Sequence, residues 1–245
     1  MRKATFNRID ALDYGGNEAM NTICSNLTFA GRNVKKIVFT SCDASEGKSF
    51  ITLQTAQNLA RRGKRVVLVD ADLRRSFLIR RHRLQTDGEW KGLAHYLAGY
   101  ESLDDVLYET NLTGLCLMPV GRDLSNPVPF LDSPYFGKLL DDLAERFDVV
   151  LVDAPPIGLV IDAAEIAQFC DGAVFVVEYG KTRRRDVASA QKQIQQAACP
   201  VLGCIINKVT LDSISAKKYY KKSYYSHYGM AYEKSAKRDG SRQKE

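Results

Sequence analysis

The residues best suited to chemistry lie in the stretch 36–49, KIVFTSCDASEGKS. A short apolar run predicts a buried strand, a loop of small and polar residues follows, and Gly47, Lys48 and Ser49 open a segment with helical spacing. The first turn of a helix presents unpaired N–H groups and the positive end of the peptide dipole, where phosphate oxygens bind. Lys48 would then reach the β- and γ-phosphates of a nucleotide, and the Ser49 hydroxyl would ligate Mg²⁺. Cys42 stands where the usual loop pattern has its first glycine, so a plain strand–turn–helix is the alternative.

Three aspartates follow apolar runs that read as strands: Asp70, Asp72 and Asp153. Each one alone could be no more than a cap for the next turn. Together with Lys48 and Ser49 they form a set that phosphoryl transfer requires, namely carboxylates near a divalent metal and a group that deprotonates the acceptor. Asp153 is suited to bind the metal ion through a water molecule. Asp70 and Asp72 would share a side of an extended backbone, so one of them could act as a base on an incoming hydroxyl.

The elements that position these residues alternate between strands and helices. Strands are predicted over residues 36–41, 65–70, 115–120, 148–153, 173–177 and 201–207. Helices are predicted over residues 18–30, 50–62, 90–97, 102–108, 134–146, 162–169 and 184–197, with Ser133 as the cap of the fifth and residues 126–134 as a loop. This alternation predicts an α/β fold with a mostly parallel central sheet flanked by helices. Ligands of such sheets bind at the carboxyl ends of the strands, where all the motifs above fall.

Length and composition favour one α/β domain over residues 1–210, with residues 1–17 loosely ordered. No apolar run is long enough to span a membrane, and the N-terminus lacks the apolar core of a signal peptide, so we expect a cytoplasmic protein. The six cysteines show no metal-ligand spacing and are interpreted as reduced core residues, although Cys42 could be oxidisable in its loop. The three histidines are far apart and are given no role.

Residues 211–245 are interpreted as a basic, tyrosine-rich tail. From residue 217 onward there are nine Lys/Arg and three Asp/Glu, whereas the remainder has 26 of each sign, so the net charge of +6 belongs to the tail. Six of the twelve tyrosines gather there: Tyr219, Tyr220, Tyr224, Tyr225, Tyr228 and Tyr232. The segment has no core-forming periodicity, so we expect it to be mobile and exposed. The alternative is a basic aromatic arm that contacts anionic lipid or RNA.

The three pieces of the site resemble the Walker A, A′ and B motifs of the bacterial tyrosine kinases (BY-kinases), a P-loop NTPase family. The A′ motif is a hydrophobic triplet followed by Asp-x-Asp-x-Arg, here VLVDADLR over residues 67–74; the B motif ends in Asp-x-Pro-Pro, here DAPP over 153–156. The A motif agrees at Thr40, Ser41 and residues 46–49, but Ser45 replaces a glycine. A second departure is in the first helix, whose Glu-x-x-Arg-x-x-Arg pattern reads Glu18, Asn21 and Cys24 here, so we expect a weakened or differently built oligomer.

The resemblance implies ATP and Mg²⁺ as cofactors and a role for each matching residue. Lys48 would bind phosphates, Asp70 would be the base on a tyrosine hydroxyl, Asp72 would support the metal site, and Ser49 and Asp153 would hold Mg²⁺. Residues near the nucleotide would further include Ser41, Ala44, Ser45, Glu46, Gly47, Phe50, Asp162 and Asn207. For Asn207 a plain turn residue is the equal alternative. The six tail tyrosines would be phosphorylated between subunits.

The resemblance also implies biological context. The kinase would be activated by the cytoplasmic segment of a separate membrane protein, a polysaccharide co-polymerase. This partner would recruit it to the inner face of the plasma membrane in capsule or exopolysaccharide export. A cognate tyrosine phosphatase is a further expected partner, and no nucleic acid is expected. The run with Arg74, Arg75, Arg80 and Arg81 is interpreted as a solvated helix face, or otherwise as a contact for phosphates or an acidic partner.

Two other functions fit parts of the pattern. One is an ATPase switch of the partition or septum-positioning type, whose signature lysine early in the loop is replaced here by Asp43. The other is a pseudo-kinase scaffold, suggested by Ser45 and the missing arginines.

Overall fold

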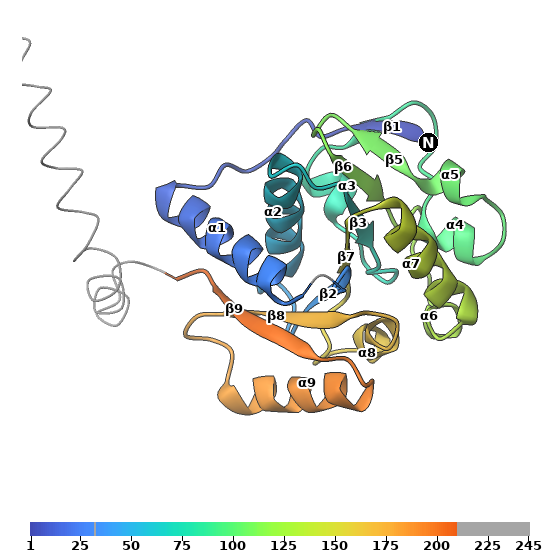
Figure 1. The fold of residues 1–245 in the computed structure, drawn as a ribbon. Coiled ribbons are helices and arrows are strands. Elements are labelled where there is room, and N and C mark those ends of the chain that lie inside the picture. Colours follow the sequence, from blue (N-terminus) through green and yellow to red (C-terminus); the bar gives the residue numbers. More distant parts are fainter. Residues whose placement is uncertain (32, 210–245) are drawn as a thin grey trace, which may run out of the picture. The chain divides into compact units, whose positions relative to one another are not determined.

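Uninterrupted apolar strands are expected at the centre of a parallel sheet, because both of their faces are covered. In the computed structural model, which describes residues 1–31 and 33–209, these strands lie in one nine-stranded sheet of order β4-β1-β5-β6-β3-β7-β2-β8-β9 (Figure 1). Its strands are β1 (Arg2–Thr5), β2 (Lys36–Ser41), β3 (Val66–Asp70), β4 (Gln85–Thr86), β5 (Tyr108–Thr110), β6 (Leu115–Met118), β7 (Val149–Asp153), β8 (Gly172–Glu178) and β9 (Val201–Asn207). The β1–β4 and β5–β6 pairs are antiparallel and the remaining pairs are parallel. The predicted fold class is therefore confirmed.

Helices cover both faces of the sheet. They are α1 (Tyr14–Phe29), α2 (Lys48–Arg61), α3 (Leu78–Arg81), α4 (Leu93–Leu97), α5 (Leu103–Val106), α6 (Val128–Leu131), α7 (Pro134–Arg146), α8 (Asp162–Ala167) and α9 (Arg184–Gln196). The buried residues of α1, α2 and α3 pack in one hydrophobic cluster, and those of α4 to α9 pack in another. Adjacent residues of a strand alternate between the two clusters: Val38 points to the second and Phe39 to the first.

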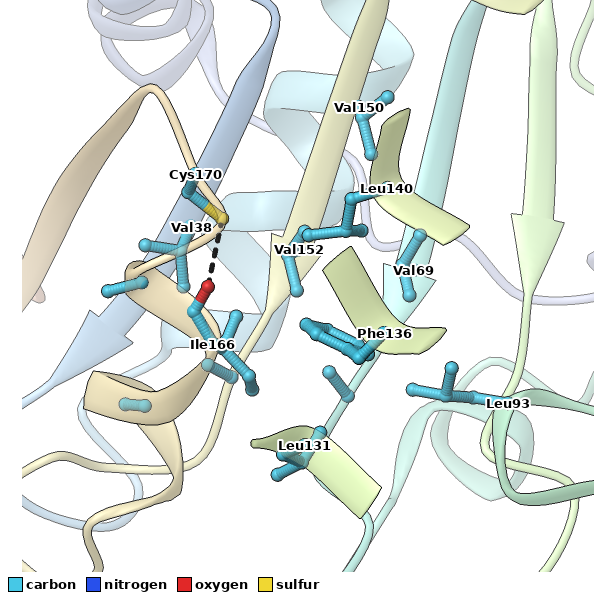
Figure 2. Packing of buried hydrophobic residues seen from close by; sticks show 14 of the residues in the cluster. Val38, Val69, Leu93, Leu131, Phe136, Leu140, Val150, Val152, Ile166 and Cys170 are labelled. Carbon is cyan, nitrogen blue, oxygen red and sulfur yellow. Dashed lines mark hydrogen bonds between the residues drawn. The ribbon is translucent and has the colours of Figure 1, made fainter. Parts of the chain in front are cut away.

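The second cluster is the one drawn in Figure 2. Phe136 of α7 lies beside Val152 of β7, Val69 of β3 and Leu93 of α4, each fully buried. The thiol of Cys170 donates a hydrogen bond to the carbonyl oxygen of Ile166 at the end of α8. This packing fixes the strands whose carboxyl ends carry the candidate site.

The prediction that residues 1–17 are loosely ordered is wrong. Residues 2–5 form β1, which lies between β4 and β5, and Ala4 and Phe6 are buried. The guanidinium of Arg2 donates to the Tyr108 hydroxyl at 2.7 Å, and Phe6 N–H donates to the side-chain oxygen of Asn111 at 2.9 Å. Helix α1 also begins before residue 18, because the Asp13 carboxylate accepts a hydrogen bond from Gly16 N–H as an N-cap.

Other local predictions need correction. The stretch predicted as a helix over residues 102–108 is a short helix, α5, followed by strand β5, and the predicted loop 126–134 contains α6. Ser133 precedes α7 as predicted, but its hydroxyl does not cap the helix; it donates to the Phe130 carbonyl at 2.7 Å. Of the basic run, only Arg80 and Arg81 lie in α3, and the solvated-face interpretation fits Arg75 and Arg80, which are exposed. Arg74 and Arg81 instead pair with acidic residues of the same chain, Asp162 and Asp10.

The six cysteines are free thiols, of which five are buried and Cys204 is exposed. Burial raises the pKa of the Cys42 thiol to about 12, and the Glu46 charge adds to this rise. Because a thiolate is the reactive form, the expectation that Cys42 is oxidisable is not supported. None of the helices in the described part of the chain is long and apolar enough to cross a membrane.

Candidate active site

The phosphate loop runs from the end of β2 to the first turn of α2. Gly47 precedes the helix with φ of 94°, in the left-handed region that favours glycine, and no side chain caps the helix N-terminus. A Cβ at Gly47 would lie 2.1 Å from the amide nitrogen of Asn207, so the position has no room for a side chain. The N–H groups of the first turn are thus left without a side-chain acceptor, as an anion site requires.

Lys48, the first residue of α2, is buried, and its side chain reaches the end of β7. Its amine donates hydrogen bonds to the Asp153 carboxylate at 2.7 Å and to the Ser49 hydroxyl at 3.2 Å. The chain thus places a cation between a carboxylate and a hydroxyl, the two oxygen types predicted to hold Mg²⁺. The geometry shows directly that Lys48, Ser49 and Asp153 lie together, as the sequence predicted.

Asp70 lies directly beside Asp153. The two residues are register partners in the adjacent parallel strands β3 and β7, which are about 4.8 Å apart. Burial, and then the Asp153 charge, raise the pKa of the Asp70 carboxyl to about 7, whereas the Ser76 hydroxyl, which donates a hydrogen bond to it, and Lys48 lower it. A carboxyl that titrates near neutral pH can accept a proton from an acceptor hydroxyl. Nothing in the sequence indicated a role for Ser76 at this site beyond its position two residues after Arg74.

Asp72 sits at the edge of this group and is partly exposed. Burial raises the pKa of its carboxyl above the usual range, the Lys48 charge lowers it, and the Asp153 charge adds a smaller rise. One of its oxygens accepts a hydrogen bond from Arg75 N–H at 3.2 Å, which fixes the turn after β3. Its predicted metal role remains a prediction.

The donor set fits magnesium bound together with a nucleotide. No three His, Cys, Asp or Glu side chains in the described residues are grouped so as to hold a metal by themselves. Mg²⁺ commonly binds through one or two carboxylates and completes its shell with water and substrate phosphates. Asp153 and Asp72 with the Ser49 hydroxyl would supply such ligands.

The Glu46 side chain is engaged by groups of the chain itself. It is buried, accepts a hydrogen bond from Asp43 N–H at 2.9 Å, and accepts another from the Thr182 hydroxyl in the loop after β8. Its carbonyl oxygen accepts a hydrogen bond from the Asn207 amide at 2.9 Å. Glu46 and Asn207 therefore fix the loop to the ends of β8 and β9; a contact of either with nucleotide stays a prediction.

The remaining loop residues shape its turn. The Ser41 hydroxyl donates to the Asp43 carbonyl at 2.8 Å, and Ala44 N–H donates to the Asp43 carboxylate at 2.7 Å. Ser45 has φ of 64°, so serine adopts the left-handed conformation at the position where the family has glycine. Asp43 thus holds the loop locally.

Two contacts that sequence reasoning missed join the site to its neighbours. The Arg74 guanidinium makes a bidentate pair with Asp162, at 2.7 and 2.8 Å, and Asp162 is fully buried at the start of α8. Both Asp162 oxygens are engaged by Arg74, which ties the turn after β3 to the start of α8. A place for Asp162 near the nucleotide stays a prediction. The Arg81 guanidinium lies over the Phe50 ring, 5.5 Å from its centroid, and connects α3 to the first turn of α2.

The predicted phosphoacceptors Tyr219, Tyr220, Tyr224, Tyr225, Tyr228 and Tyr232 lie outside the described residues.

Comparison with known proteins identifies relatives of both the sequence and the fold. A profile of the family CbiA, the CobQ/CobB/MinD/ParA nucleotide binding domain, matches residues 37–231. The tyrosine-protein kinase CpsD of Streptococcus agalactiae is 39% identical over 192 residues, which are 78% of this chain and 83% of the relative. The tyrosine-protein kinase YwqD of Bacillus subtilis is 31% identical over 214 residues, 86% of each chain.

Among solved structures, the BceF tyrosine kinase domain superposes with a TM-score of 0.68 at 32% identity, covering 78% of this chain and 75% of that one. The kinase domain of the Escherichia coli tyrosine kinase ETK gives 0.72 at 26% identity, covering 80% and 78%. The septum site-determining protein MinD of Pyrococcus horikoshii gives 0.63 at 23% identity, covering 73% and 72%, and shares the fold alone. The P-loop geometry, the acidic strand ends and these relatives agree: the chain belongs to the bacterial tyrosine-protein kinases, within the CobQ/CobB/MinD/ParA nucleotide-binding family.

Proposed function

We propose that this kinase uses Mg²⁺ and ATP to phosphorylate tyrosines of its own C-terminal cluster, between subunits. The observation that carries the proposal is the 2.7 Å contact between the Lys48 amine and Asp153, with Asp70 as the register partner of Asp153. A buried cation, two neighbouring carboxylates and an uncapped helix start form an environment suited to a nucleotide triphosphate and a hydroxyl acceptor.

Each residue has a defined task in the proposed reaction. Mg-ATP, when bound, supplies the phosphoryl group with part of its charge neutralised by the metal. Lys48 leaves Asp153 and neutralises charge on the β- and γ-phosphates, while the N–H groups at the start of α2 orient them. Asp153, Asp72 and Ser49 hold the metal. Asp70, kept in place by Ser76, accepts the proton of the tyrosine hydroxyl.

The tail supplies both substrate and switch in this proposal. Its local charge of +6 is opposite to that of the acidic site and its nucleotide, which favours docking. Each phosphate adds about −1.5 to −2 at neutral pH, so six would bring the tail to roughly −3 to −6. The phosphorylated tail would then be repelled from the site, and subunit contacts would dissolve.

The test is the formation of phosphotyrosine by the purified full chain with Mg-ATP, with and without the cytoplasmic segment of the membrane partner. We expect phosphotyrosine in the parent, a stronger signal with the partner, and none in Lys48→Met, which also excludes a contaminating kinase. The absence of phosphotyrosine under both conditions would favour a scaffold or a nucleotide-switched ATPase.

A mixing experiment tests transfer between subunits. A chain with Phe at all six tail positions keeps the site, and Lys48→Met keeps the tail. Mixed with Mg-ATP, the first should phosphorylate the second. If the parent is phosphorylated and the mixture is not, transfer occurs within one chain. A six-Phe chain that assembles and disassembles like the parent under ATP would contradict the charge switch.

The family resemblance supports the wider setting. We propose that the kinase acts in capsule or exopolysaccharide synthesis, recruited to the inner face of the plasma membrane by a membrane-anchored co-polymerase. A cognate tyrosine phosphatase would reverse the modification. Co-purification with such a membrane protein, lost when its cytoplasmic segment is deleted, is the check.

A further inference from the structure

The segment after β8 carries a concentration of positive charge that the kinase site does not use. Lys181, Arg183, Arg184 and Arg185 are all exposed, in the loop and at the start of α9. Lys181 lies 3.5 Å from Glu178, and Arg185 lies 3.5 Å from Asp186, both weak surface pairs. Within residues 1–31 and 33–209, Arg183 and Arg184 have no acidic partner within 4.0 Å.

A hollow of about 340 Å³ lies beside these cations, at the edge where Figure 1 shows β9, β8 and α9 together. Val177, Val187 and Ile206 give it an apolar lining, and polar groups come from Arg184, Thr182, Tyr179 and Glu178. Among the described residues, the Glu178 carboxylate is the one acidic group of this lining, and the Lys181 amine lies 3.5 Å from it. An apolar slot next to a guanidinium that has no acidic partner among the described residues suits a flat apolar ring that carries an anionic group.

We propose that this hollow binds the phosphotyrosine side chain of a phosphorylated tail, an inference that rests on the proposed kinase function for the source of its ligand. The phenyl ring would pack on the apolar lining and the phosphate would meet Arg184. Three of the four cations are arginines, whose planar fork binds phosphate oxygens bidentately, which lysine cannot do. An anionic lipid surface would need charge but no hollow, so the observations favour the phosphotyrosine.

The position of the hollow suits a product of the neighbouring site. Thr182, which lines it, donates its hydroxyl to Glu46 of the phosphate loop. Tyr219, the first tyrosine of the cluster, follows Asn207 by twelve residues, a length that can span up to about 40 Å. A tail repelled from a neighbouring subunit's phosphate site after modification would thus have a place to bind on its own chain.

The test uses a synthetic peptide of residues 219–232 with phosphate on Tyr224, and measures its Kd for the dephosphorylated full chain by fluorescence anisotropy in saturating Mg-ADP. No catalysis is needed, so a negative result here is distinct from failure of the kinase proposal. We expect the phosphopeptide to bind at least about tenfold more tightly than the unphosphorylated peptide, because charge-assisted hydrogen bonds are lost without phosphate. Arg184→Ala should remove this difference, and Arg184→Lys should keep part of it.

Two variants serve as matched controls. Arg80→Ala removes another exposed arginine, from α3, which contributes no residue to the lining of the hollow, and should change the Kd less than twofold. Cys204→Trp keeps the charge but fills the hollow from an exposed strand position, and should weaken phosphopeptide binding as Arg184→Ala does.

Several results would overturn the proposal. Equal binding of both peptides, or an unchanged Kd in Arg184→Ala, would show that the hollow does not recognise phosphate. If the phosphopeptide binds in the absence of nucleotide and saturating Mg-ADP abolishes this binding, the hollow is a nucleotide site. Binding to phosphatidylserine vesicles that is lost in Arg184→Ala, with phosphopeptide binding unaffected, would assign the cations to a lipid surface.

Discussion

The candidate site contains buried carboxylates that lie next to each other, an arrangement that destabilises a folded protein. Among residues 1–31 and 33–209, no cationic group lies at hydrogen-bond distance from the Asp70 carboxyl. Asp70 accepts hydrogen bonds from the Ser76 hydroxyl and from Asp72 N–H, and Asp153 beside it carries the same charge. A buried like-charged neighbour destabilises the ionised form, and sites that bind metal and phosphate accept this cost for chemistry. Lys48 offsets part of it by pairing with Asp153.

This arrangement predicts how stability changes with pH. The pKa of Asp70 in the folded chain, about 7, lies above its ordinary value of 3.8. The contribution of this carboxyl to the free energy of unfolding is therefore fully present below about pH 4 and is lost as the pH rises through 7. Asp70→Asn does not titrate, so the variant should not lose this stability. Without nucleotide or Mg²⁺, the parent's free energy of unfolding should therefore fall by about 2 kcal/mol relative to that of the variant between pH 5 and pH 8. Urea melts at both pH values measure it, and a constant difference would contradict the raised pKa.

At the scale of elements, the site is held by ties between segments that are distant in the sequence. Arg74 after β3 pairs with Asp162 at the start of α8, and Glu46 in the phosphate loop accepts from Thr182 after β8. The ends of β3 and β7 and the glycine before α2 could be predicted because their signals are local: the apolar runs before Asp70 and Asp153, and Gly47 followed by Lys48. The ties could not, because each depends on which strand ends become neighbours.

The Arg74–Asp162 pair should therefore be strongly coupled. Asp162 is fully buried and receives two hydrogen bonds from Arg74, so removing the arginine leaves an uncompensated buried charge. A double-mutant cycle with Arg74→Ala and Asp162→Ala should give a coupling free energy of about 2 kcal/mol in denaturant melts.

The control is the exposed Arg65–Asp148 pair, which is similar in distance, 2.9 Å, with side chains 63% and 36% exposed. Its cycle should give less than about 1 kcal/mol. Equal coupling in the two cycles would mean that burial does not set the strength of the Arg74 tie.

At the scale of the whole molecule, the sequence indicated a parallel sheet covered on both faces but not its outer strands. The partners of β1 are residues 85–86 and 108–110, eighty or more positions away, and four residues without strict alternation give no local strand signal. The family pattern of the first helix was a second point that sequence reasoning left open. Cys24 is fully buried, with its thiol toward the Thr55 carbonyl of α2, whereas Asn21 is exposed and accepts a hydrogen bond from Arg62.

These surroundings predict different effects on stability when the family's arginine is introduced at position 21 or at position 24. Cys24→Arg would force a charge into the α1–α2 contact and should lower the free energy of unfolding by about 3 kcal/mol or more. Asn21→Arg, on the exposed face, should fold like the parent, and only this variant could strengthen the oligomer. Thermal melts and sedimentation measure the two effects. A Cys24→Arg chain as stable as the parent would show that position 24 can turn outward.

In the proposed function, carboxylates at adjacent strand ends, gathered around Lys48, catalyse tyrosine phosphorylation. The most direct measurement is the initial rate of phosphotyrosine formation with Mg-ATP in Asp153→Asn, compared with Asp148→Asn, which makes the same change just before the opposite end of β7. Loss of a metal ligand is worth several kcal/mol, so Asp153→Asn should slow the reaction about 100-fold or more, while Asp148→Asn keeps the parent rate. Equal rates in the two variants, at equal nucleotide occupancy, would contradict the account.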